Sequence, residues 1–176
     1  MSRREHTGTN LFLVWGYPTL IALLIQFAAK ILRNADWYQW LWAAIPLVGA
    51  PLMLYFMNKD YARTHNRTIE QDIALQLWLF IAAACAIGGF ATGYAGIYQL
   101  CYCTFESLLI SLGCFMTGAI SRATSMKRCG ILGAALAFTC PFLQGHLWPW
   151  QMLVTAIVVV ITLIIPGHLT RQAVNV

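Results

Sequence analysis

Charged side chains are scarce in this chain, since Asp, Glu, Lys and Arg together make up only 10% of its 176 residues. An ordinary soluble domain carries about 25% of such residues. So few charges cannot cover the surface of a soluble protein of this size, and 60% of the residues are hydrophobic. Long apolar runs in such a composition are typical of a protein embedded in a lipid bilayer.

Motifs of well-known enzyme classes are also missing. The chain contains no phosphate-binding glycine loop, no Gly-x-Ser-x-Gly, no His-Glu-x-x-His and no Cys-x-x-Cys pair. The net charge of +5 comes with no basic run or basic-aromatic module, which argues against a nucleic-acid partner. The sequence therefore favours a non-enzymatic role, keeps an enzyme only as a third alternative, and implies no cofactor.

Six apolar segments predict six transmembrane helices in one polytopic domain that covers residues 1–176. A helix needs about 20 residues to cross the hydrocarbon core. The segments span residues 11–32, 40–57, 73–92, 97–120, 129–145 and 152–165. Because the connections are short, we expect an all-α bundle in which Pro166 and Gly167 end the last helix.

Basic residues alternate between the two sides of this predicted bundle. Nine of the 11 lie in the N-terminal segment, the second and fourth connections and the tail, and only Lys30 and Arg33 lie on the other side. Cytoplasmic loops hold an excess of Lys and Arg, so both termini are predicted to be cytoplasmic. Five of the seven tryptophans lie at the opposite boundary, as an interfacial aromatic belt does: Trp37, Trp40, Trp42, Trp148 and Trp150.

Glu106 is the one carboxylate predicted to lie deep inside a transmembrane segment. It follows the start of the fourth segment by about eight residues, or about 12 Å of helix. An ionised acid is costly at that depth, so Glu106 is a candidate ligand- or ion-binding residue, with Lys30, His146 and Gln26 as candidate partners. The two interpretations are a carboxylate that handles protons or cations, and a structural group that is ion-paired or protonated.

Three cysteines are predicted near the outer boundary: Cys101, Cys103 and Cys140. In an oxidising compartment Cys140 could form a disulfide with Cys101 or Cys103. Together with His146 they could instead hold a soft metal such as Cu(I) or Zn. The favoured interpretation is simpler, because free cysteine often serves as a small buried hydrophobe.

Small residues recur along one face of the fourth segment at helical spacing: Cys103, Ser107, Ser111, Cys114 and Gly118. Such a face lets two membrane helices approach closely. A short connection joins the third and fourth segments as an antiparallel hairpin. We therefore predict that this face packs against residues 82–89 of the third segment, which read AAACAIGG.

Four stretches resemble a group of small multi-pass bacterial membrane proteins of unknown function. They are FLVWGYPTLIALLIQF from Phe12, WLWAAIPLVGAPL from Trp40, LGCFMTGAISR from Leu112 and IPGHL from Ile165. The resemblance implies a multi-pass architecture in the bacterial inner membrane, and it transfers no site.

The sequence predicts a transport or channel component that handles a small molecule or an ion, with Glu106 in its path. The alternative is a non-transporting scaffold or regulatory subunit that docks on a larger complex. The expected partners are the lipid bilayer and a small molecule or ion, with a protein partner or a second copy of the chain in the alternative. A cavity at Glu106 open to one side would favour transport, whereas a sealed Glu106–Lys30 pair would favour the alternative.

Overall fold

The computed structural model describes residues 6–33, 51, 55, 69–95, 102–143, 147 and 149–174. These residues form α1 (His6–Arg33), α3 (Ile69–Ala95), α4 (Tyr102–Ile120), α5 (Thr124–Ala137), the 3-10 turn η1 (Cys140–Phe142), α6 (Pro149–Val159), the π-helical turn η3 (Val160–Ile164) and α7 (Ile165–Val174). The predicted all-α class is confirmed for this part of the chain. Most of the predicted second span, together with Cys101 and His146, lies outside the described residues.

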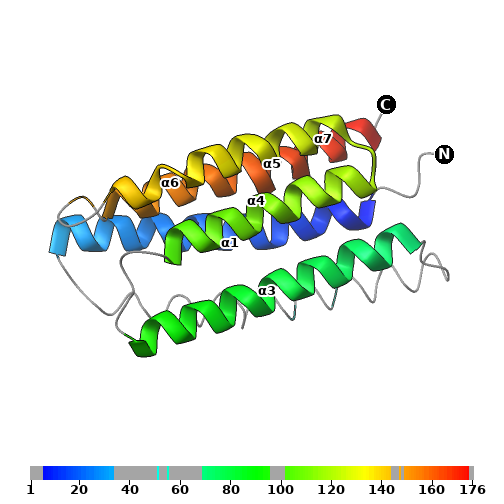
Figure 1. Ribbon diagram of the computed structural model, residues 1–176. Coiled ribbons are helices and arrows are strands. Elements are labelled where there is room, and N and C mark those ends of the chain that lie inside the picture. The colour runs from blue at the N-terminus through cyan, green and yellow to red at the C-terminus, as the bar shows by residue number, and fades with distance from the viewer. Residues whose placement is uncertain are drawn as a thin grey trace.

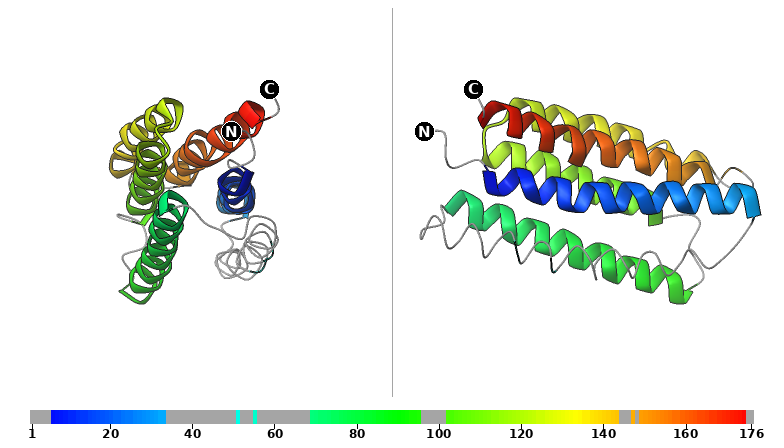
Figure 2. Two further views of the ribbon diagram at one scale, coloured as in Figure 1. Left: turned by 90° about the vertical axis from the view of Figure 1, so that its right-hand side faces the viewer. Right: turned by 180° about the vertical axis from the view of Figure 1, so that it is seen from behind.

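The helices run side by side as an elongated bundle (Figure 1). Seen end-on, α4 and α5 lie on one side, α1 and the α6–α7 helix lie on the other, and α3 packs beside α4 (Figure 2). The start of α1 and the end of α7 lie at the same end of the bundle (Figure 1). Alternate directions of successive helices follow from the short connections.

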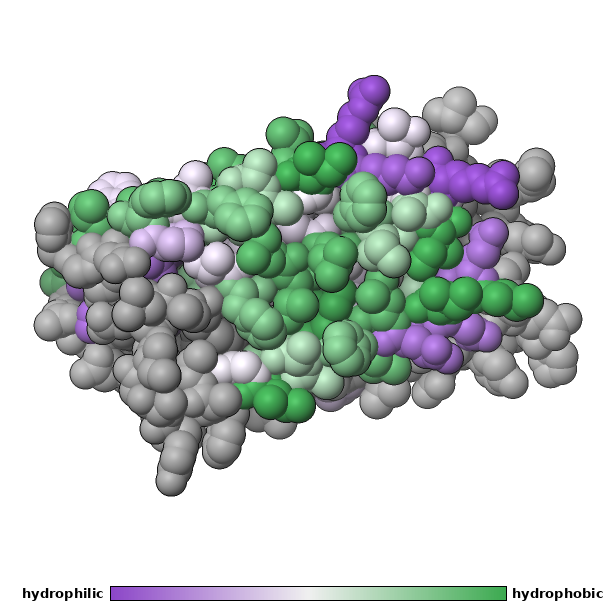
Figure 3. All heavy atoms as spheres, in the orientation of Figure 1, coloured by the Kyte–Doolittle hydropathy of each residue, from purple (hydrophilic) through white to green (hydrophobic). Residues whose placement is uncertain are grey.

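Three helical stretches are long and apolar enough to cross a membrane: Phe12–Leu32, Cys103–Ile120 and Pro149–Leu169. A space-filling view shows apolar side chains over the middle of one face (Figure 3). On the same face, hydrophilic side chains gather at the end where α1 begins and α7 ends. This distribution is compatible with a membrane protein, since apolar surface faces lipid and polar surface faces water.

The fifth helix differs from the predicted segment 129–145. It begins earlier, at Thr124, and it ends at Ala137 after 14 residues. The chain then turns through η1, whose second residue is Pro141. Proline has no N–H to continue the ladder, and it disfavours helical backbone at the preceding residue, so the helix closes here.

The last helix does not end at Pro166 and Gly167, as the sequence had indicated, because α7 continues through both residues to Val174. The reason lies in the π turn η3 just before them, where the N–H of Ile165 bonds to the carbonyl of Val160. A π turn shifts the hydrogen-bond register by one residue, which lets the helix continue past a proline that lacks an N–H. The prediction of a stop at this site was wrong.

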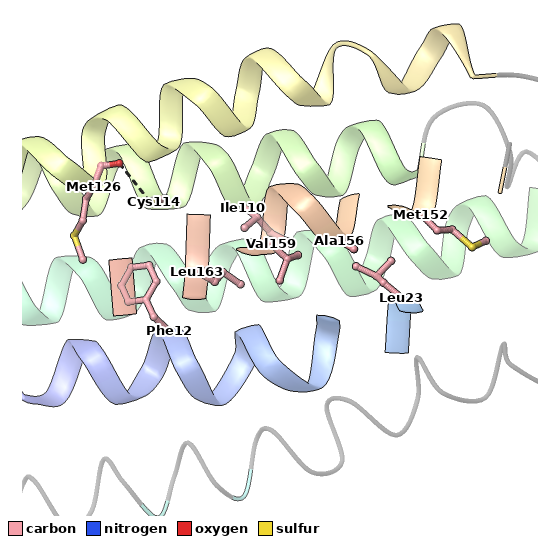
Figure 4. Close-up of a cluster of buried hydrophobic side chains, with 9 residues drawn as sticks. All are labelled: Phe12, Leu23, Ile110, Cys114, Met126, Met152, Ala156, Val159 and Leu163. Atoms are coloured by element: carbon pink, nitrogen blue, oxygen red, sulfur yellow. Dashed lines mark hydrogen bonds between the residues drawn. The ribbon is translucent and has the colours of Figure 1, made fainter. Parts of the chain in front are cut away.

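The core lies where α1, α4, α5 and the α6–η3 helix meet (Figure 4). Its nine buried members come from all four: Phe12, Leu23, Ile110, Cys114, Met126, Met152, Ala156, Val159 and Leu163. The Cys114 thiol donates to the Met126 carbonyl at 3.4 Å, which ties α4 to the first turn of α5. Side chains of α1 therefore share one core with helices that lie far away in the sequence.

The small-residue face of α4 packs against α5 and α6, and the prediction that it meets α3 was wrong. A Cβ added at Gly133 of α5 would lie 2.6 Å from the hydroxyl oxygen of Ser111 on this face. Ser107 of this face donates a hydrogen bond to Thr155 of α6 at 3.2 Å. The glycines of α5 supply the second smooth surface that such close packing needs, so α4 turns its small residues toward them.

Helix α3 packs on a different face of α4. The indole N–H of Trp78 donates to the Thr117 hydroxyl at 3.0 Å. A Cβ added at Gly113 would lie 3.1 Å from the same indole ring, so glycine makes room for it. The ring of Phe12 lies edge-on to Trp78 at 5.2 Å, which joins α1 to this contact.

Candidate functional site

Glu106 is the fifth residue of α4 as the structure describes it, about 6 Å along the helix rather than the expected 12 Å. Its side chain is only 4% exposed. The side chain is therefore buried within the protein, but it lies near one end of α4 and not at the predicted depth.

The Oε2 atom of Glu106 is buried and has no hydrogen-bond partner among the residues that the structure describes. Its electrostatic neighbours include two thiols, Cys85 on α3 and Cys103 one turn earlier on α4. The next residue, Ser107, is directed toward α6 and bonds to Thr155. A buried polar atom without a partner is unusual in a folded protein and needs a specific explanation.

Lys30 makes no hydrogen bond to the Oε2 atom of Glu106, which has no such partner among the described residues. The register of the helices explains this. Gly16 lies against Ile164 and the Phe27 ring lies 5.5 Å from that of Trp150, so α1 runs antiparallel to the α6–η3 helix. In this register Lys30 lies level with the start of α6, beyond the level of Glu106.

Gln26 lies closer to the level of Glu106, within about one helical turn of it along α1. Its side chain is 8% exposed, so its amide is held inside the bundle. Of the predicted partners, the structure thus places Gln26 near the depth of the acid and Lys30 further out. His146 lies outside the described residues.

Two of the predicted outer cysteines, Cys103 and Cys140, meet at Thr155. Both thiols lie within hydrogen-bonding reach of its hydroxyl, and both are free rather than joined in a disulfide. Cys140 is fully buried, because η1 packs between α4 and α6. Within the described part of the chain no three His, Cys, Asp or Glu residues come together as a metal site.

A polar face of α6 and η3 was not predicted from the sequence. Gln151 is 1% exposed, and its side-chain amide donates to the Leu143 carbonyl at 2.6 Å, which anchors the end of η1. Thr155 and Thr162 are also buried, and their hydroxyls bond to the carbonyls four residues earlier. The spacing of 151, 155 and 162 places all three on one helix face, and this regularity was visible in the sequence.

A small hollow of about 10 Å³ lies between α1, α3 and η3, lined by Phe12, Trp15, Trp78 and Leu163. Its lining is aromatic and aliphatic, and Glu106 is not part of it. The hollow and the buried acid are therefore separate features of the bundle.

Comparison with protein-family models finds no matching family, and no curated protein or solved structure matches the chain. Function is accordingly argued from the site, whose central feature is a buried carboxyl group beside thiols and hydroxyls. Such a site can bind and release a proton or accept a small polar ligand, because its carboxyl oxygen is not committed to a protein partner.

Proposed function

We propose that this chain is a multi-pass protein of the bacterial inner membrane with six transmembrane helices and both termini in the cytoplasm. The three apolar helices support a membrane location. The common end of α1 and α7 supports the same side for both termini (Figure 1). The basic residues Arg122, Lys127 and Arg128 lie in the α4–α5 connection and the first turns of α5, and the excess of Lys and Arg on cytoplasmic sides supports the orientation.

Within that membrane, the chain acts as a transport or channel component for a small molecule or ion, and Glu106 is the polar point in its path. The observation that carries this proposal is the buried Oε2 atom without a partner. An unsatisfied buried polar group costs about 1–3 kcal/mol, and a purely structural acid gains nothing in return. Ionisable residues inside membrane proteins commonly mark ion pathways or proton relays.

The experiment that tests transport is charge movement in liposomes that contain the purified protein. A potential imposed across the liposome membrane is expected to drive a current with the wild type and no current with Glu106→Gln. Glu70→Gln is the matched control, because Glu70 is an exposed glutamate in the first turn of α3. Equal currents for the wild type and Glu106→Gln would refute a role for this acid in transport.

The alternative function is a scaffold or regulatory subunit. It is favoured by the close packing of α4 on α5, where an added Cβ at Gly130 would meet backbone atoms. Native mass spectrometry of protein extracted gently from its own membrane separates the two proposals. A bound small molecule that is lost in Glu106→Gln supports transport, whereas a stoichiometric protein partner without a ligand supports the scaffold.

A further inference from the structure

We infer that the ion taken up by Glu106 is the proton, so that the chain is a proton-coupled transport component. This inference rests on the proposed function and specifies what its central residue binds. It follows from the ligands that surround the carboxyl group, from the charges that face it, and from the polar groups that lead away from it.

The ligand set around Glu106 suits a proton better than a metal ion. Hard cations such as Ca²⁺ take about six to eight oxygen ligands. The described residues contain no cluster of three metal-binding side chains, at Glu106 or elsewhere. A proton needs one oxygen atom and no coordination shell, and the free Oε2 atom supplies it.

The charges that face Glu106 also favour its neutral form. Among the described residues, the ionisable groups that interact with it are Cys85 from α3 and Cys103 from its own helix, and neither is a cation. The register of α1 on the α6–η3 helix places Lys30 level with the start of α6. Removing an ionised carboxylate from water without a counter-charge is costly, whereas a carboxylic acid carries no net charge.

A line of polar groups leads from the neighbourhood of Glu106 to one end of the bundle. The Ser107 hydroxyl donates to Thr155 at 3.2 Å, and the Thr155 hydroxyl donates to the Gln151 carbonyl at 2.9 Å. The Gln151 amide in turn donates to the carbonyl of Leu143, beside η1. These groups are buried and interrupt the apolar interior on the side where the helix α4 begins.

Infrared spectroscopy of the protein in lipid nanodiscs at neutral pH tests the protonation state directly. The difference spectrum between wild type and Glu106→Gln is expected to show a carboxylic-acid C=O band, which shifts in D₂O. Glu70→Gln, which removes an exposed acid, is expected to show carboxylate bands instead. Labelling glutamate with ¹³C in the wild type shifts the same acid band without any variant. Carboxylate bands for Glu106 would overturn the inference.

Ion-specific flux in liposomes separates this inference from the proposed function. Proton entry measured with a trapped pH-sensitive dye is expected in the wild type, absent in Glu106→Gln and retained in Glu70→Gln. A sodium or potassium flux that depends on Glu106 would overturn the proton assignment and leave transport intact. An acid band without flux of any ion would overturn transport and leave Glu106 as a protonated acid.

Discussion

Replacing Glu106 by an apolar residue tests whether its side chain is an unpaired acid or one half of an ion pair. The free energy of unfolding should rise in the first case and fall in the second. Glu106 and Gln151 are both polar and almost fully buried, at 4% and 1% exposure. They differ in one respect, because Gln151 donates to Leu143 at 2.6 Å whereas the Oε2 atom of Glu106 has no partner. Replacing each with methionine, which has a similar length, turns this difference into a measurable one.

Glu106→Met is expected to raise the free energy of unfolding by about 1–3 kcal/mol, because it removes a desolvated polar atom that has no partner. Gln151→Met is expected to lower it by about 1–3 kcal/mol, because it leaves the partly buried Leu143 carbonyl without its hydrogen-bond donor. In a chain of this size each kcal/mol shifts Tm by about 2–4 °C. The two variants should therefore move Tm in opposite directions.

The assay is thermal unfolding of both variants and the wild type in the same lipid nanodiscs, followed by intrinsic tryptophan fluorescence. If Glu106→Met loses about 3–5 kcal/mol, the acid is ionised and held by a buried partner, and the reasoning above is refuted. If Glu106→Met is more stable than the wild type but no longer moves charge in liposomes, then Glu106 lowers stability for the sake of function, as functional residues often do.

Three further predictions concern packing and topology. Gly130→Ala is expected to cost about 1–3 kcal/mol in thermal unfolding, because its Cβ would meet the α4 backbone at 2.7 Å. Gly88→Ala is the control, because its Cβ would meet only the half-exposed ring of Phe105, and it should leave the free energy of unfolding unchanged. Equal losses of stability in the two variants would contradict this account. Thr155→Val removes a buried acceptor and should cost about 1 kcal/mol, against no loss for the exposed Thr139→Val. A cysteine at Gly96 (Gly96→Cys) should react with membrane-impermeant thiol reagents from outside, and labelling only from the cytoplasm would refute the proposed topology.

Much of the local structure follows from the composition of the chain and the length of its apolar runs. Apolar runs of about 20 residues have to satisfy their backbone hydrogen bonds internally, which predicts helices for residues 11–32 and 97–120 before any packing is known. The burial of Glu106 was predictable in the same way, since an acid in the middle of an apolar run has no route to water. The limits of α5 were less predictable, because Pro141 and the turn η1 decide where it ends.

The partners of these helices were decided only by the tertiary structure. A step of three or four residues shows that Ser107, Ser111 and Cys114 share a face, but any helix with small residues can meet that face. The glycines of α5 made the closer fit, so α4 packs there and α3 lies along its Trp78 contact.

The residues around Glu106 also depend on the tertiary structure. Lys30 and Glu106 fall on the same side of the membrane by sequence, yet the register of α1 on α6 places the lysine level with the start of α6. The continuation of the last helix past Pro166 depends on a π turn that shifts the hydrogen-bond register by one residue. Sequence by itself determined that these segments are apolar and helical, because such runs must satisfy their backbone hydrogen bonds internally. Register and helix pairing, which depend on contacts between residues far apart in the chain, decided what each buried group touches.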